Sequence, residues 1–121
     1  MSGANRTLLE AIVRMFATGD VSEAEALFAA NYVDHQGLGG TEITGPSGLR
    51  RVVQAARSSF TELDVRIVDV LSDGDEVAAR LRWHGTSARG VVDRETIDIL
   101  RFENGKAVEH WGARLWISDP G

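Results

Sequence analysis

The fold is decided by Thr96-Ile-Asp-Ile-Leu-Arg-Phe-Glu-Asn-Gly-Lys-Ala-Val-Glu-His-Trp-Gly112. Apolar and polar residues alternate on both sides of Asn104-Gly105, and an Asn-Gly pair between two such runs predicts a β-hairpin. The hairpin carries an acid, Asp98, and a histidine, His110, on neighbouring strands. We expect it to form the back wall of a small-molecule pocket.

The length of the turn determines which side chains meet, because strand residues alternate between the two faces of a sheet. A two-residue loop pairs Glu103 with Lys106 and separates Asp98 from His110. A three-residue loop shifts the pairing by one residue and places Asp98 opposite His110. We favour the three-residue loop, in which only Gly105 needs a positive φ.

An acid opposite a histidine raises the pKa of the imidazole and fixes its tautomer, so this pair is a candidate for acid–base chemistry. The alternative is a cross-strand ion pair that only stabilises the register of the hairpin.

The chain before the hairpin also has a period of two from about residue 63. It predicts an antiparallel meander of four strands at 63–71, 76–85, 92–102 and 107–117, with a loop at 86–91. On the second strand, either the face with Arg80, Arg82 and His84 or the face with Leu81 and Trp83 could line a pocket.

The first half of the chain has helical periodicity instead. Apolar residues at helical spacing predict an amphipathic helix over 5–18 that ends at Gly19; they are Leu8, Leu9, Ile12, Val13 and Phe16. Residues 22–25 resemble a capping box and predict a short second helix whose buried stripe includes Phe28.

Three further elements complete the first half. They are a short strand at 31–35, a Gly-rich flexible loop at 36–44, and a third helix that begins at Gly45-Pro46. Helices followed by a meander predict an α+β fold in one domain, 1–121. We expect three N-terminal helices on a strongly curved, mainly antiparallel sheet, forming a cone with an internal pocket.

The composition argues against several classes of function and partner. The chain has 121 residues, 43% hydrophobic and 26% charged, which is typical of a globular protein. It has no cysteine, which excludes thiol chemistry and disulfides, and its three histidines lack metal-ligand spacing. The net charge of −5, without a basic stripe or a long apolar run, argues against nucleic acid and membrane partners. We expect a cytoplasmic protein.

The candidate catalytic residues are Asp98, His110 and His35, the last at the expected pocket mouth. The candidates for contact with a small hydrophobic ligand are Tyr32, Trp83, Thr96, Leu100, Arg114 and Trp116. No metal ligand and no cofactor is expected.

Several motifs resemble those of the SnoaL-like polyketide cyclases, whose fold is shared with ketosteroid isomerase and limonene-epoxide hydrolase. They are Tyr32-Val-Asp-His35, Gly45-Pro-Ser-Gly-Leu49, Phe60-Thr-Glu-Leu-Asp64, Trp83-x-Gly-Thr86, and Ile97-Asp-Ile-Leu-Arg-Phe-Glu-Asn-Gly-Lys106 followed by Val108-Glu-His-Trp111. The resemblance implies a homodimer through the sheet. It also implies a hydrophobic cavity for cofactor-free cyclase or isomerase chemistry in secondary metabolism, such as antibiotic biosynthesis.

The sequence departs from this family at two positions and in one loop, since Ser87-Ala-Arg-Gly90 is shorter than the family's usual loop and lacks its histidine. Gly112 stands where the family often carries a catalytic Asp, and Asp98 stands where the aldol cyclases have a histidine. The aldol mechanism therefore does not transfer directly, and Asp98 becomes the candidate base with His110 as its partner or as the acid. Two other hypotheses remain, an epoxide hydrolase and a non-catalytic ligand-binding or dimerisation module.

Overall fold

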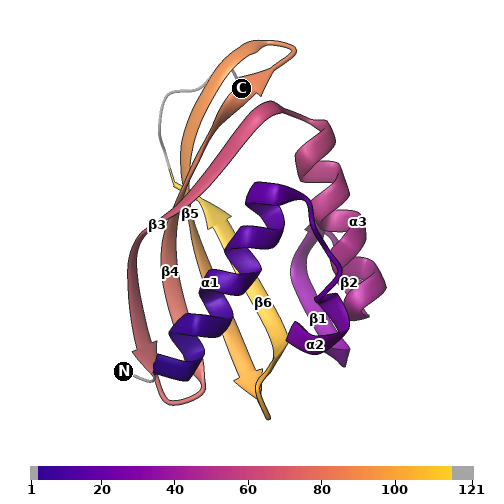
Figure 1. The fold of residues 1–121 in the computed structure, drawn as a ribbon, viewed down its shortest axis with the longest axis vertical. Coiled ribbons are helices and arrows are strands. Elements are labelled where there is room, and N and C mark those ends of the chain that lie inside the picture. Colours follow the sequence, from indigo (N-terminus) through magenta and orange to yellow (C-terminus); the bar gives the residue numbers. More distant parts are fainter. Residues whose placement is uncertain (1–2, 116–121) are drawn as a thin grey trace.

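The computed structural model describes residues 3–115 (Figure 1). The helices are α1 (Gly3–Thr18), α2 (Ala24–Leu27) and α3 (Gly45–Ser58). The strands are β1 (Phe28–Leu38), β2 (Thr41–Thr44), β3 (Thr61–Asp73), β4 (Glu76–Ser87), β5 (Gly90–Glu103) and β6 (Lys106–Arg114). They form one sheet in the order β2-β1-β6-β5-β4-β3, in which only β1 and β6 are parallel.

The sheet curves around the helices, which lie on one of its faces (Figure 1). The core lies where α1 and α3 pack against this concave face; its buried residues include Leu9, Ile12, Val13, Leu49, Val53, Leu81, Leu100 and Phe102. The predicted α+β architecture is therefore confirmed.

Helices α1 and α3 match their predictions. Leu9, Ile12 and Val13 are buried at helical spacing, and α1 ends where Gly19 adopts a φ of 80° and donates its N–H to the carbonyl of Met15. Pro46 stands in the first turn of α3.

The capping box predicted at 22–25 is wrong. Helix α2 has only four residues, its N-cap position is Glu23, and no side chain caps it. Phe28 is not helical but begins β1, where its ring packs edge-on against Tyr32 with centroids 4.7 Å apart. The short helix thus gives way to a long strand with a buried aromatic pair.

The Gly-rich segment at 36–44, predicted as a flexible loop, continues β1 and then forms β2. Gly39 and Gly40 have φ values of 59° and 83° in the turn between these strands. A Cβ at Gly37 would lie 1.7 Å from the carbonyl oxygen of Thr41. These glycines therefore allow a close strand connection rather than flexibility.

The β5–β6 hairpin has a two-residue turn, so the predicted three-residue loop is wrong. Glu103 pairs with Lys106, and Asn104 and Gly105 both have positive φ, 53° and 78°. Two left-handed central residues make the turn of type I′, whose twist matches that of the strands.

A two-residue loop was expected to separate Asp98 from His110, but an irregularity next to the turn brings both to the same face of the sheet. Phe102 pairs with Ala107 but Arg101 pairs with Glu109, so β6 contains one extra residue in a β-bulge. Beyond the bulge Leu100 pairs with His110 and Asp98 with Gly112. Asp98 and His110 are therefore diagonal neighbours on the same face, although they are not directly opposite.

The remaining strands extend the predicted ones. The loop predicted at 86–91 is a tight hairpin connection in which Ser87 pairs with Gly90. Strand β6 ends at Arg114 and excludes Leu115, so the predicted strand at 107–117 is too long; residues 116 and 117 lie outside the described residues. No helix within residues 3–115 has the length and apolar character needed to span a membrane.

Candidate functional site

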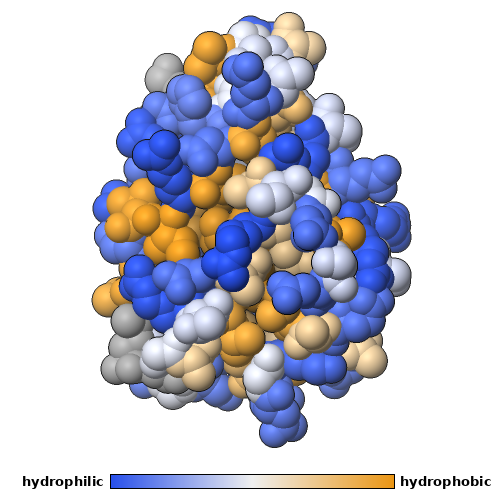
Figure 2. All heavy atoms as spheres, viewed as in Figure 1, coloured by the Kyte–Doolittle hydropathy of each residue, from blue (hydrophilic) through white to orange (hydrophobic). Residues whose placement is uncertain are grey.

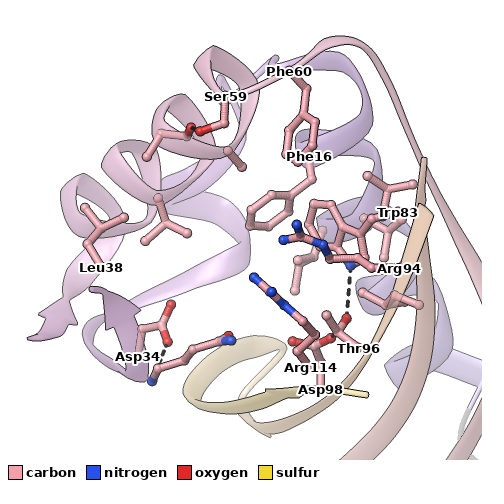
Figure 3. A pocket seen from close by; sticks show the side chains of 18 of the residues that line it. Phe16, Asp34, Leu38, Ser59, Phe60, Trp83, Arg94, Thr96, Asp98 and Arg114 are labelled. Carbon is pink, nitrogen blue, oxygen red and sulfur yellow. Dashed lines mark hydrogen bonds between the residues drawn. The ribbon is translucent and has the colours of Figure 1, made fainter. Parts of the chain in front are cut away.

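A cavity of about 1130 Å³ lies between the helices and the concave face of the sheet (Figure 3). Its apolar walls come from α1, α3 and the sheet and include Leu9, Ile12, Phe16, Leu49, Val52, Leu81 and Val92. On the surface, hydrophobic residues are visible between hydrophilic ones toward the middle of the face in Figure 2. The volume exceeds what a few waters would fill and is suited to a ligand of several rings.

His110 is held between two carboxylates on the wall of this cavity. Its Nδ1 lies 2.8 Å from Asp34 Oδ1, and its Nε2 lies 2.7 Å from Asp98 Oδ1. The three side chains are only 13%, 4% and 12% exposed, respectively. Strand β6 lies between β1 and β5 in the sheet, so the three strands supply one residue each.

Asp34 is the member of this triad that sequence reasoning missed. It pairs with His110 across the parallel β1–β6 ladder and also accepts the backbone N–H groups of Gln36 and Gly37. The available signal was its spacing from Tyr32, since residues two apart on a strand share a face. The parallel partner strand, however, could not be inferred from local pattern.

Asp98 is oriented by a second set of hydrogen bonds. The indole Nε1 of Trp83 donates to Thr96 Oγ1 at 3.0 Å, and the Thr96 hydroxyl donates to Asp98 Oδ2 at 2.7 Å. Figure 3 shows Trp83, Thr96 and Asp98 along one wall of the cavity. Each oxygen of Asp98 thus accepts one hydrogen bond and retains a lone pair for a ligand.

The charges of the triad follow from its geometry. Burial alone would lower the pKa of His110, but hydrogen bonds and charge from Asp34 and Asp98 outweigh it and raise that pKa to about 9. Burial opposes ionisation of Asp34, yet His110 holds the pKa of Asp34 below its usual value. At neutral pH the triad is therefore two carboxylates around an imidazolium, with one net negative charge.

The raised pKa of His110 predicts how stability depends on pH. Since the folded pKa exceeds the ordinary value of 6.5, this stabilisation is complete below about pH 6.5 and is lost as pH rises through about 9. We expect the free energy of unfolding to fall by about 3 kcal/mol over that range, measured by urea unfolding. His84→Gln, which alters an exposed histidine, should keep this dependence, and His110→Gln should remove most of it. An unchanged dependence in His110→Gln would contradict the assignment.

Tyr32 places a neutral hydroxyl at the same wall. Burial raises the pKa of its phenol, with Asp34 and Asp98 adding to the effect, so the group stays protonated. Its hydroxyl makes no hydrogen bond within residues 3–115, where no fully buried side-chain polar atom lacks a partner. Tyr32 is only 2% exposed but lines the cavity, so its hydroxyl is a candidate donor to a ligand.

The structure explains why position 112 is a glycine in this chain. A Cβ at this position would lie 2.4 Å from Gln36 Oε1 and 2.9 Å from Asp98 Oδ1. The space that a side chain at 112 would need is thus occupied by Gln36 and by the carboxylate of the facing strand.

Most of the predicted site residues line the cavity together. They are Tyr32, Trp83, Thr96, Asp98, Leu100, His110 and Arg114. The Leu81 and Trp83 face of β4 lines the cavity, whereas Arg80 and Arg82 form ion pairs with acids outside it. Trp116 lies outside the described residues.

His35 does not line the cavity, contrary to expectation. Its ring nitrogens lie 2.7 Å from Glu42 and 2.8 Å from Glu109, and its ring stacks on Trp111 with centroids 5.1 Å apart. The reason is alternation along β1, which directs Asp34 into the cavity and its neighbour His35 to the other face. No group of three or more His, Asp or Glu in residues 3–115 is placed to hold a metal ion.

Several solved structures of other proteins have a similar architecture. A proposed polyketide cyclase from Bacillus cereus is 29% identical, with a TM-score of 0.79 over 88% of this chain and 71% of the other. A SnoaL-like polyketide cyclase from Agrobacterium tumefaciens is 20% identical, with a TM-score of 0.79 over 94% and 92% of the two chains. TsrD from Streptomyces laurentii is 20% identical, with a TM-score of 0.83 over 94% and 90%.

A protein from Catenulispora acidiphila with a ketosteroid isomerase-like fold also matches, with a TM-score of 0.76 at 16% identity over 88% and 83% of the two chains. No curated protein sequence matches the chain. The SnoaL-like domain matches residues 9–110, which span α1 through His110. The chain belongs to the SnoaL-like family.

Proposed function

We propose that this chain is a cofactor-independent acid–base enzyme that cyclises or isomerises a small, hydrophobic, polyketide-like carbonyl compound. The observation that carries the proposal is the Asp34–His110–Asp98 triad on the wall of a large apolar cavity. Membership of the SnoaL-like family supports the same class of reaction. The homodimer, the cytoplasmic location and a role in antibiotic biosynthesis stay predictions.

Asp98 is the proposed base. The triad carries one net negative charge in a poorly solvated cavity, and a proton taken by Asp98 leaves a neutral Asp34–His110 pair. Proton transfer from a carbon next to the ligand carbonyl moves this negative charge from the triad to the carbonyl oxygen, where a hydrogen-bond donor such as Tyr32 would stabilise it. In a cyclisation, the carbanion attacks a second carbonyl and Asp98 returns its proton to the new alkoxide. In an isomerisation, Asp98 returns it to a different carbon, so neither reaction consumes a proton.

Tyr32→Phe should slow this chemistry without unfolding the protein. The Tyr32 hydroxyl is the neutral donor that stabilises charge developing on the carbonyl oxygen. Removing one such donor typically lowers kcat by about 10²-fold. Rates and thermal unfolding would be measured together; an unchanged rate would remove Tyr32 from the mechanism.

The proposal can be tested before the natural substrate is identified. A panel of bicyclic ketones, such as β-tetralone, would be incubated with the protein in deuterated water, and exchange at the carbon next to the carbonyl followed by NMR. Catalysed exchange is expected for ketones that bind. If ligands bind and none exchanges faster than in buffer, the chain is a binding module. Labelled solvent oxygen in the product of an epoxide would instead indicate a hydrolase.

A further inference from the structure

Arg114 differs from the other arginines of the sheet. On the outer face, Arg66, Arg80, Arg82 and Arg101 all form ion pairs with carboxylates. The side chain of Arg114, at the end of β6, makes neither an ion pair nor a hydrogen bond with any residue from 3 to 115. Its guanidinium is therefore not paired directly with any carboxylate in the described part of the protein.

Arg114 is also directed into the cavity. It pairs with Thr96 in the β5–β6 ladder and lies among the residues that line the cavity. Figure 3 shows its side chain extending inward beside Thr96 and Asp98, on the side where Arg94 also extends inward. Arg94 is placed by the ring of Phe60, whose centroid lies 5.9 Å from its guanidinium carbon.

The acids of the cavity already accept hydrogen bonds from other donors. The oxygens of Asp98 accept from His110 and Thr96, and Asp34 Oδ1 accepts from His110 and from two backbone N–H groups. A ligand carboxylate can therefore pair with Arg114 without displacing a protein carboxylate. A planar guanidinium matches a carboxylate through two parallel hydrogen bonds.

We propose that the substrate is an anion, namely a hydrophobic oxo acid whose carboxylate lies on Arg114 while its carbonyl lies near Tyr32 and Asp98. This inference rests on the proposed function of the same cavity and specifies its substrate class. The apolar walls contributed by α1 and α3 would contact the hydrocarbon part of the acid. The guanidinium would hold the acid in one orientation relative to the base.

The test compares naphthoate with its methyl ester, which share a ring system and differ in charge. Calorimetry at neutral pH would give both dissociation constants for the wild type, Arg114→Met, Arg114→Lys and the outer-face control Arg66→Met. We expect the wild type and Arg66→Met to bind the acid at least about tenfold more tightly than the ester. Arg114→Met should lose this preference, and Arg114→Lys should keep part of it.

Equal binding of acid and ester by the wild type, binding of neither, or a preference that survives in Arg114→Met would overturn the inference. Ketone exchange measured in parallel separates it from the proposed function. Exchange without an acid preference overturns only the substrate class. An acid preference without any exchange overturns the catalytic role and leaves an anion-binding cavity.

Discussion

Asp98→Asn is expected to lower the rate of catalysed ketone exchange by about 10²–10⁴-fold, the usual contribution of a well-placed general base. The amide has the same shape as the carboxylate, and its oxygen can still accept from His110 Nε2. The amide has no basic oxygen, and the substitution removes the net negative charge of the triad, which favours proton uptake. Exchange followed by NMR in deuterated water, with a ketone that binds both proteins, measures the effect.

The matched control for Asp98→Asn is Asp93→Asn. Asp93 is also on β5, but it is exposed and pairs with Arg82 outside the cavity. It should leave exchange unchanged. If Asp98→Asn folds, binds ketone and exchanges it as fast as the wild type, Asp98 is not the base. An NMR titration of His110 should also give a lower pKa in Asp98→Asn than in the wild type. This result would check that the two side chains interact in solution.

The fold was predictable where the pattern was local. In α1 and α3 apolar residues recur at helical spacing, and in β3, β4 and β5 polar and apolar residues alternate, because each element buries one face against the core. The predicted ends of the strands were less accurate, because pairing in a sheet extends a strand past its apolar run. The short second helix was predicted, but it ends at Leu27, and Phe28, expected on its buried stripe, begins β1 instead.

Part of the candidate site was also predictable, because it too depends on a local pattern. Asp98 and His110 are close in sequence, and their shared face follows once a hairpin is recognised. The predicted turn and the direct pairing of Asp98 with His110 were both wrong, but their shared face was right, because the bulge near Ala107 shifts the register by one further residue and so restores the alternation. Asp34 is 76 residues from His110, and only the parallel β1–β6 pairing brings them together. Parallel partners leave no turn signal between them, so the second carboxylate was not visible in the sequence.

Asp34→Ala is expected to destabilise the protein by about 3–5 kcal/mol, because it removes a buried charge-assisted hydrogen bond and leaves Nδ1 of His110 without its acceptor, while Asp98 still balances the charge of His110. Asp34 is almost completely buried, and its loss also removes the acceptor for two backbone N–H groups. Urea unfolding at neutral pH would measure the difference. Asp64→Ala, which breaks the exposed pair with Arg66, is the control and should cost much less.

The same variant separates a structural role for Asp34 from a purely catalytic one. Since Asp34 helps to keep His110 charged, its removal should lower the pKa of His110 and reduce the loss of stability between neutral and alkaline pH. A variant as stable as Asp64→Ala, with an unchanged His110 titration, would contradict the triad. A destabilised variant whose His110 titrates lower would support the assignment of Asp34 to the triad.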